Sequence, residues 1–114
     1  IVEDDPNMQT LVSEYLPDSY AVDTVGNARS AIDRAESERY DLVLMDINLR
    51  DSMNGVDILH RFREDSKCEN ALIVAITAYA LPGDGESFKE EGFDGYVSKP
   101  FTKETLYERL IQVL

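Results

Sequence analysis

The sequence has few basic residues, a single cysteine and no long apolar run. Because Cys68 is the only cysteine, no internal disulfide can form, which fits a reducing compartment. The longest apolar run covers residues 71–76, far short of the roughly 20 residues that a membrane-spanning helix needs. No basic segment followed by an apolar one opens the chain, so secretion has no support. We therefore expect a cytoplasmic protein that does not associate with membranes.

Acidic residues outnumber basic ones by 23 to 11, which gives a net charge of −12. A surface of this sign repels phosphate backbones, so direct nucleic-acid binding is not expected. The acidic excess suits a basic protein partner or a divalent cation. It is equally consistent with a charge that only keeps a small domain in solution. Only the arrangement of the charges can separate these possibilities.

The length of 114 residues is ordinary for one domain. The sequence contains no internal repeat, low-complexity stretch or linker, so we expect a single domain over residues 1–114. A chain of this size can bury roughly two-thirds of its unfolded surface without metal or disulfide support. Ile1 and Val2 are expected to be the end of a first strand whose beginning lies outside this numbering.

Strand-like and helix-like segments alternate along the chain. Strands are expected at residues 1–2, 20–25, 42–46, 71–76 and 96–98. Helical spacing and caps predict helices that begin at Pro6 after Asp5, at Ala28 after Asn27, at Gly55 and after Thr102. Residues 82–92 have only Phe88 to bury and predict a marginal helix that Gly92 ends.

The last helix is expected to turn four side chains inward: Leu106, Leu110, Ile111 and Leu114. Five strand–helix repeats with short connections predict an α/β fold. Its five-stranded parallel sheet would be doubly wound, with helices on both faces.

Polar residues follow the carboxyl ends of four predicted strands, and they are Asp4 with Asp5, Asp46, Thr77 and Lys99. In a parallel sheet these ends lie along one edge, so the residues converge. Carboxylates beside strands are often only turn and cap residues, which is the simpler interpretation of Asp4 and Asp5 taken alone. Three converging carboxylates favour a hard cation such as Mg²⁺. Asp46 would then be a nucleophile that accepts a phosphoryl group, with Lys99 and the Thr77 hydroxyl on the phosphoryl oxygens.

In combination, four motifs resemble the receiver domain of bacterial response regulators: EDD near the start, LVLMD in the middle, TA after the fourth strand and KPF after the fifth. The resemblance covers essentially the whole chain. It implies a flavodoxin-like (βα)5 fold in a two-component or phosphorelay system. It also implies that a histidine kinase or a histidine phosphotransfer domain phosphorylates Asp46. Such a domain is not an enzyme on other substrates, because it promotes only its own phosphorylation and dephosphorylation.

The same resemblance implies roles for individual residues. Mg²⁺ would be held by Asp5, Asp46 and the backbone carbonyl of Asn48, with Asp4 acting through water. The backbone amide of Ala78 would contact the phosphoryl group. The bond between Lys99 and Pro100 would be cis, an isomer that is rare outside X-Pro bonds.

A conformational switch is implied as well. On phosphorylation Thr77 would move toward the phosphate and the ring of Tyr96 would turn inward, although Tyr96 can also be read as an ordinary strand aromatic. Partners implied by the resemblance are the phosphohistidine donor, an effector or kinase domain in the same full-length chain, and a second copy in a phosphorylation-dependent homodimer.

The loop after Asp46 departs from the family pattern. Gly55 follows Asp46 by nine positions, one more than usual, and Leu49 and Arg50 replace a common Met-Pro pair. Asn48 and Tyr79 occupy variable positions that tune dephosphorylation in the family. Outside this region, His60 is expected on the surface and Cys68 as an ordinary loop thiol.

Three other functions are compatible with parts of the pattern. A magnesium-dependent phosphohydrolase of the haloacid dehalogenase type needs a second aspartate where this chain has Asn48. A flavin carrier needs a phosphate-binding loop where this chain has Asp4, Asp5 and Pro6. A receiver-like binding module that is never phosphorylated would not need the acidic set together with Thr77 and Lys99. The cognate kinase, the signal and the output are not specified by the sequence.

Overall fold

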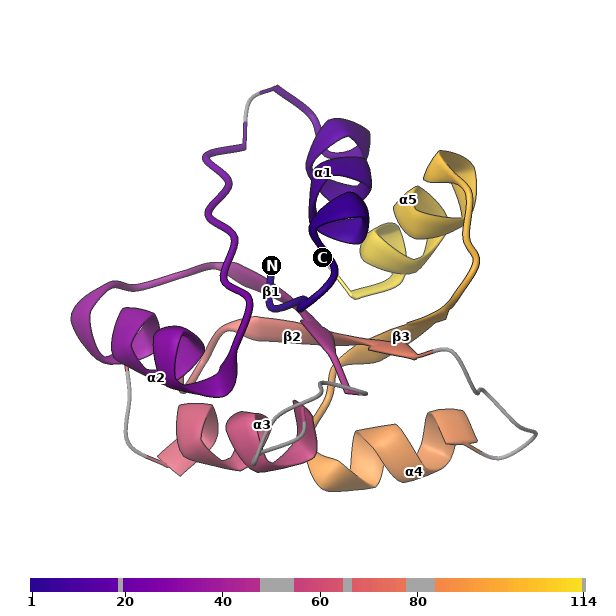
Figure 1. Cartoon of the computed structure of the whole chain (residues 1–114). Helices are drawn as coiled ribbons and strands as arrows, with labels where there is room; N and C mark the ends of the chain where they lie inside the picture. Colours follow the sequence, from indigo (N-terminus) through magenta and orange to yellow (C-terminus); the bar gives the residue numbers. More distant parts are fainter. Residues whose placement is uncertain (19, 48–54, 65–66, 78–83, 114) are drawn as a thin grey trace.

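In the part of the chain that the structure describes, three parallel strands form the sheet, and the first two carry long apolar runs (Figure 1). The strands are β1 (Leu42–Asp46), β2 (Leu72–Thr77) and β3 (Gly95–Ser98), and they pair in the order β1-β2-β3. This computed structural model describes residues 1–18, 20–47, 55–64, 67–77 and 84–113, without the side chains of 84–86. β1 and β2 lie in the middle of the sheet and are buried on both faces, as their continuous apolar runs predict.

Two single-residue bridges extend the sheet beyond β1. Val2 pairs in parallel with Met45 of β1 and, on its other side, with Val25. The Val2 amide donates to the Leu44 carbonyl at 2.8 Å, and the Glu3 amide donates to the Val25 carbonyl at 3.0 Å. The order across the sheet is therefore Val25, Val2, β1, β2, β3, with all segments parallel. This is the doubly wound arrangement that the strand–helix alternation predicts.

The described residues include five helices, which lie between these segments or after the last of them, and local sequence fixes where most of them begin. They are α1 (Pro6–Tyr15), α2 (Ala28–Ser37), α3 (Gly55–Glu64), α4 (Asp84–Glu91) and α5 (Lys103–Val113). The predicted caps are confirmed where side-chain oxygens accept amide hydrogen bonds: Asp5 from Asn7, Asn27 from Ser30, and Thr102 from Thr105. Gly92 follows α4 with a φ of 120°, a backbone conformation that favours glycine.

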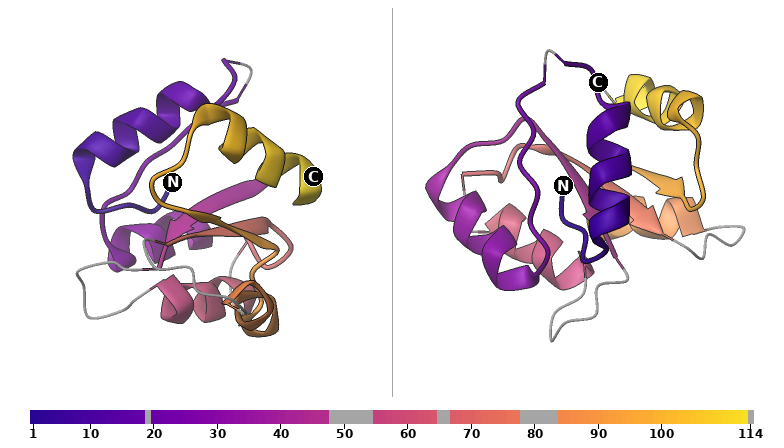
Figure 2. Two further views of the ribbon diagram at one scale, coloured as in Figure 1. Left: turned by 90° about the vertical axis from the view of Figure 1, so that its right-hand side faces the viewer. Right: turned by 45° about the horizontal axis from the view of Figure 1, so that its top comes forward.

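Helices cover both faces of the sheet (Figure 2). α1 and α5 lie on one face, and α2, α3 and α4 lie on the other. Alternate residues of β1 supply the two cores: Leu44 packs with α1 and α5, whereas Val43 and Met45 pack with α2 and α3. Each fully buried aliphatic side chain of this kind contributes about 1.5–3 kcal/mol. The prediction of a flavodoxin-like α/β fold is confirmed.

Two local predictions are wrong. The strand expected at residues 20–25 is reduced to the bridge at Val25, and residues 20–24 are exposed. This segment has few backbone groups to pair with, because the neighbouring segment in the sheet is only the short stretch around Val2. Ile111 is 74% exposed rather than buried, since α5 directs its neighbour Leu110 into the core instead. Leu114 lies outside the described residues.

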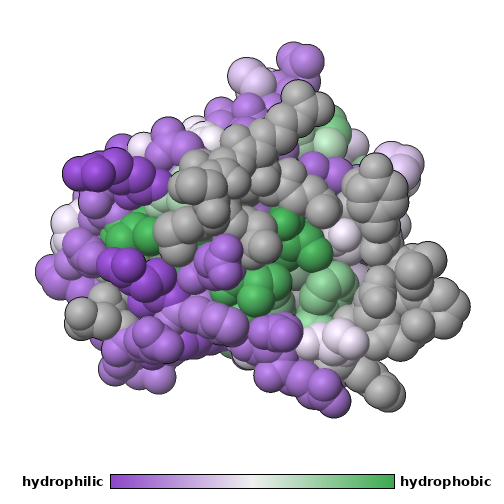
Figure 3. All heavy atoms as spheres, turned by 60° about the horizontal axis from the view of Figure 1, so that its bottom comes forward, coloured by the Kyte–Doolittle hydropathy of each residue, from purple (hydrophilic) through white to green (hydrophobic). Residues whose placement is uncertain are grey.

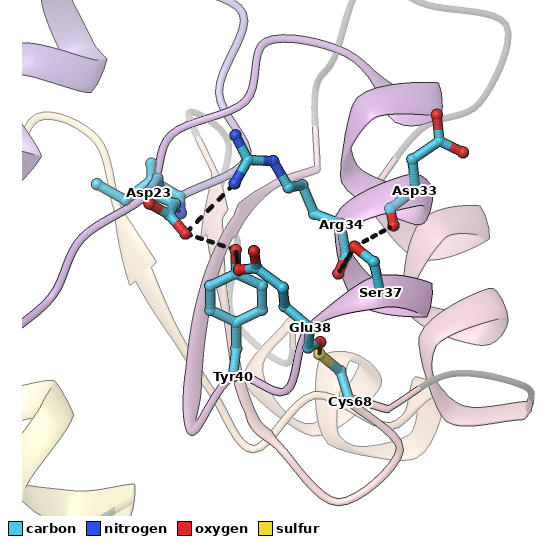
Figure 4. Close-up of polar contacts among 8 residues, drawn as sticks. Asp23, Asp33, Arg34, Ser37, Glu38, Tyr40 and Cys68 are labelled. Atoms are coloured by element: carbon cyan, nitrogen blue, oxygen red, sulfur yellow. Dashed lines mark hydrogen bonds and ion pairs between the residues drawn. The ribbon is translucent and has the colours of Figure 1, made fainter.

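A polar cluster lies beside the start of β1, at the opposite end of this strand from Asp46. Figure 4 shows its contacts. The Tyr40 hydroxyl lies 2.6 Å from Asp23 Oδ2 and 2.9 Å from Glu38 Oε2, and Arg34 pairs with Asp23 at 3.6 Å. Burial and these carboxylates raise the pKa of the Tyr40 hydroxyl. We call Asp23, Arg34, Glu38 and Tyr40 the outer cluster. It ties the exposed segment before Val25 to the end of α2 and the start of β1.

The face formed by α3 and α4 combines hydrophilic residues with a hydrophobic area at its middle (Figure 3). Val56 of α3 and Phe88 of α4 are partly buried apolar side chains of this layer. Phe88 contacts the rings of Phe93 and Tyr96. Its side chain thus anchors α4 to β3. The sequence analysis expected Phe88 to be the residue that this helix buries. Among the described helices, none is long and apolar enough to cross a membrane.

Candidate functional site

Asp46 is the last residue of β1 and is only 2% exposed. The strand continues into Ile47, whose amide donates to the Ile76 carbonyl at 3.1 Å. Gly55 at the start of α3 presses against this turn. A Cβ at position 55 would lie 2.6 Å from Ile47 Cα and 2.7 Å from the Asp46 carbonyl oxygen. Glycine is therefore required here for α3 to pack directly against the backbone that carries Asp46.

Glu3 and Asp4 bring two more carboxylates to Asp46. Because Val2 pairs with Met45, the next residue on each segment, Glu3 and Asp46, also stand side by side. One carboxylate oxygen from each of Glu3, Asp4 and Asp46 lies within 4.8 Å of the others. Glu3 is 1% exposed, and Asp4 is partly buried. These three residues form an acidic group with the oxygen donors and close spacing of a divalent-cation site.

Lys99 supplies the cation of the site. Its Nζ lies 3.1 Å from Glu3 Oε2 and 3.3 Å from Asp46 Oδ2. The Lys99 amide donates to the Thr77 carbonyl at 2.7 Å, which extends the pairing of β2 and β3 by one residue. The Lys99–Pro100 peptide bond is cis, as predicted. We call Glu3, Asp4, Asp46 and Lys99 the inner cluster.

Burial and charge shift the ionisation of this cluster. Burial raises the pKa of Glu3 to about 7, and the Asp46 charge adds to the rise, although the hydrogen bond from Lys99 opposes it. Burial by itself would lower the pKa of Lys99, but its contacts with Glu3 and Asp46 outweigh burial and raise it. Lys99 is therefore held in its charged form between the two carboxylates.

Thr77 and Tyr96 lie on one face of neighbouring strands. Thr77 ends β2, is 1% exposed and pairs with Ser98, while Tyr96 pairs with Ala75. Side chains alternate along a strand, so Thr77, Ala75 and Tyr96 share a face. The partly buried Tyr96 ring has the Arg109 guanidinium 5.1 Å from its centroid. Ala75, the residue opposite Tyr96, is fully buried and has the smallest side chain of the three.

The structure assigns the acidic residues differently from the sequence analysis. It brings together Asp4, Asp46 and Lys99, as predicted, but Asp5 is exposed and its carboxylate caps α1 at 2.9 Å from the Asn7 amide. The acidic group contains Glu3 in place of Asp5. The expectation of Asp5 as a metal ligand is corrected, because its cap interaction directs the carboxylate to the helix.

Glu3 is the functional candidate that the sequence analysis missed. The EDD motif includes it, but only the pairing of Val2 with Met45 puts Glu3 beside Asp46. Several further predictions lie outside the described residues: the Asn48 carbonyl, Leu49, Arg50, the Ala78 amide and Tyr79.

Two residues outside the site were also assigned from sequence. His60 is exposed, as predicted, and lies 3.2 Å from Glu91. Cys68 lies in a turn as expected, but it is fully buried and contacts the Glu38 carbonyl.

Comparisons with known proteins agree with this geometry. Residues 1–111 match the family described as response regulator receiver domain. The chain is 34% identical over 115 aligned residues to the response regulator ArlR of Staphylococcus haemolyticus, an alignment that covers all of this chain and 51% of ArlR. The chain therefore spans about half the length of this curated relative.

Two solved structures show the same fold. The chemotaxis response regulator CheY4 of Vibrio cholerae superposes with a TM-score of 0.88 at 31% identity, covering 99% of this chain and 94% of CheY4. The receiver domain of the sensor histidine kinase PA1611 from Pseudomonas aeruginosa, a structure with magnesium coordinated in the active site cleft, gives a TM-score of 0.81 at 34% identity, with 94% and 88% covered. From its motifs, its fold and these matches, the chain belongs to the family of response regulator receiver domains of two-component systems.

Proposed function

We propose that Asp46 accepts a phosphoryl group from the phosphohistidine of a histidine kinase or a histidine phosphotransfer domain. One observation carries this proposal: the buried Asp46 carboxylate shares the Lys99 ammonium with Glu3 at the carboxyl edge of the sheet. A cation is thus already placed at the atom that would receive a phosphoryl group. A carboxylate with a purely structural role does not need both this burial and this acidic surrounding.

The transfer is a substitution at phosphorus. A carboxylate oxygen of Asp46 forms the new P–O bond, while the P–N bond to the donor histidine breaks and its electron pair returns to the imidazole nitrogen. The product is an acyl phosphate on Asp46. Lys99 exchanges its contact with the Asp46 carboxylate for one with a phosphoryl oxygen, so the added negative charge meets an existing positive one.

Glu3, Asp4 and Asp46 would hold Mg²⁺. Glu3 and Asp46 share the ammonium group of Lys99, and Asp4 adds a third carboxylate to the group. The remaining negative charge and the oxygen donors suit a hard divalent cation. When bound, Mg²⁺ supplies charge neutralisation to the phosphoryl oxygens. The Asn48 carbonyl stays a predicted further ligand.

We also propose that Thr77 and Tyr96 couple phosphorylation to a change of shape. Their shared face and the small Ala75 beside them support an inward rotation of the Tyr96 ring once the Thr77 hydroxyl binds the phosphoryl group. The Ala78 amide stays a predicted contact of the same group. Inward rotation would separate Tyr96 from Arg109 and from Phe88, which would change the surface at α4 and α5.

The proposal is tested with acetyl phosphate and Mg²⁺, followed by intact mass measurement. We expect one phosphate per chain, labile to hydroxylamine, that is lost when Mg²⁺ is chelated. Asp46→Asn should abolish the adduct. Asp41→Asn, an exposed aspartate directly before β1, is the matched control and should be phosphorylated like wild type. An adduct that persists in Asp46→Asn contradicts the assignment, and multiple turnover of a small phosphate ester without an adduct would indicate a phosphohydrolase.

The partners follow from the same proposal. A phosphohistidine donor is required, and a phosphorylation-dependent homodimer remains a prediction. Because the chain spans about half of ArlR, we propose that an effector or kinase domain shares its full-length chain. The receiver domain of residues 1–114 would promote only its own phosphorylation and dephosphorylation and would not act on other substrates. It would do so in the cytoplasm, where such donors present their phosphohistidine.

A further inference from the structure

The turn that carries Glu3 and Asp4 is held by a small set of hydrogen bonds. It joins Val2 in the sheet to the start of α1. The Glu3 amide donates to the Val25 carbonyl at 3.0 Å, and the Asp5 amide donates to Glu3 Oε1 at 3.2 Å. The Glu3 carbonyl accepts from the side-chain amide of Gln9, Nε2, at 2.5 Å. Gln9 is thus the residue of α1 whose side chain reaches back to the acidic turn.

Gln9 is well placed for this contact. Its side chain is partly buried, and its backbone amide donates to the Asp5 carbonyl at 3.0 Å. Gln9 therefore binds both ends of the acidic turn, which we define as residues 3–5: its side chain binds the Glu3 carbonyl and its backbone amide binds the Asp5 carbonyl. Gly26 packs over the same contact, since a Cβ there would lie 3.5 Å from Gln9 Nε2 and 3.8 Å from the Glu3 carbonyl.

We infer that Gln9 is a positioning residue for the cation site formed by Glu3, Asp4 and Asp46. The Glu3 carbonyl belongs to the planar peptide unit that joins Glu3 to Asp4. Fixing this carbonyl therefore fixes ψ of Glu3 and φ of Asp4, the two torsions that set how the neighbouring carboxylates stand relative to each other. Without the Gln9 amide the peptide plane can rotate, and the two carboxylates lose their common direction toward Asp46.

The chemistry of the glutamine side chain suits this role. Its amide donates a strong hydrogen bond without adding charge, so it orients the acidic turn and does not compete with a cation. A lysine or arginine would bring a second positive charge beside Lys99. Groups that orient ligands from outside typically change metal affinity by about 10–100-fold when they are removed. The inference rests on the proposed function, because it concerns the Mg²⁺ site of that proposal.

Gln9→Met tests the inference, because methionine keeps the length and helix propensity of glutamine and removes the donor. We expect the Mg²⁺ dissociation constant, measured by calorimetric titration, to rise about tenfold. At saturating Mg²⁺ the rate of phosphorylation by acetyl phosphate should return to within about twofold of wild type, since Asp46 and Lys99 are untouched. In the metal-free protein the NMR signal of the Asp4 amide, which shares the peptide unit with the Glu3 carbonyl, should shift.

Thr10→Met is the matched control, on the exposed side of the same helix. It should leave the Mg²⁺ affinity and the Asp4 amide signal unchanged, and urea unfolding of both variants separates positioning from stability. Wild-type Mg²⁺ affinity in Gln9→Met overturns the role of Gln9 and leaves the proposed function standing. Failure of the wild-type protein to bind Mg²⁺ overturns both.

Discussion

The inner and outer clusters contain similar chemical groups. They lie at opposite ends of the strands of one sheet, the inner cluster at the carboxyl ends and the outer cluster at the amino ends. Each combines carboxylates with one basic side chain, and each joins segments that are distant in the sequence. In the inner cluster Glu3 and Asp46 are 1% and 2% exposed. In the outer cluster the side chains of Arg34 and Asp23 are 49% and 45% exposed. Burial, and not composition, is the main difference between them.

This difference has a physical consequence. An exposed ion pair is solvated in both partners and contributes at most about 1 kcal/mol. A buried carboxylate has lost its water, so its charge depends on the groups that remain around it. That dependence gives the inner cluster its shifted ionisation and makes an arriving cation or phosphoryl group energetically significant. In the outer cluster burial also raises the pKa of the Tyr40 hydroxyl. Its Arg34–Asp23 pair, however, is about half exposed, so water already solvates these charges.

The largest difference is expected when each cluster loses its basic side chain. Lys99→Met leaves Glu3 and Asp46 buried without their cation, which should lower the free energy of unfolding by about 2–4 kcal/mol at neutral pH without Mg²⁺. Arg34→Met removes an exposed partner and should cost less than about 1 kcal/mol. Urea unfolding of both variants measures the contrast. Equal losses would show that burial does not distinguish the clusters.

A smaller effect is expected from the ionisation of Glu3. Its pKa in the folded protein is raised to about 7 from an ordinary value of 4.5, so between these values the folded state binds more protons than the unfolded state. The free energy of unfolding should therefore fall as pH rises from 4.5 to 7, by about 1–3 kcal/mol from this group.

Metal-free urea unfolding across this pH range checks the prediction. Glu3→Gln should remove most of the decline, because glutamine does not titrate. Glu38→Gln in the outer cluster is the matched control and should keep the wild-type pH profile. A profile that is unchanged in Glu3→Gln would assign the decline to another group.

A smaller loss of stability than for Lys99→Met is also expected from Tyr40→Phe. The hydroxyl has one proton and therefore donates to only one of its two carboxylate neighbours at any moment. The substitution thus removes about one strong hydrogen bond, and the free energy of unfolding should fall by about 0.5–1.5 kcal/mol. Phosphorylation of Asp46 by acetyl phosphate should keep its wild-type rate. A rate change of tenfold or more would mean that the two edges of the sheet are coupled.

Local sequence predicted the elements best where a single residue sets the backbone. Pro6 after Asp5, Asn27 before α2 and Gly92 after α4 act within one helical turn of their own position. The residues 20–25 were misassigned because β-branched and aromatic content describes only a tendency to pair. Whether a strand forms depends on a neighbouring segment that offers backbone groups, and here that neighbour is the short stretch around Val2.

The sequence predicted only part of the site, because it does not show which acidic side chain the fold turns toward Asp46. The sequence assigns Asp5 two roles, helix cap and metal ligand, and one carboxylate does not fill both when the cap interaction turns it toward Asn7. Glu3 takes its place in the acidic group. Gln9 carries no signal in the sequence, since its contact with the Glu3 carbonyl exists only after α1 folds back beside the turn.

The sequence by itself determined the order of strands and helices, the helix caps, and the set of residues that follow the strand ends. These features depend on contacts within a few residues or on the regular alternation of a parallel sheet. Only the tertiary structure decided which acidic residue faces Asp46, how deeply it is buried and which side chain binds its carbonyl. Those outcomes depend on the register of Val2 against Met45, a pairing across 43 positions that no local pattern specifies.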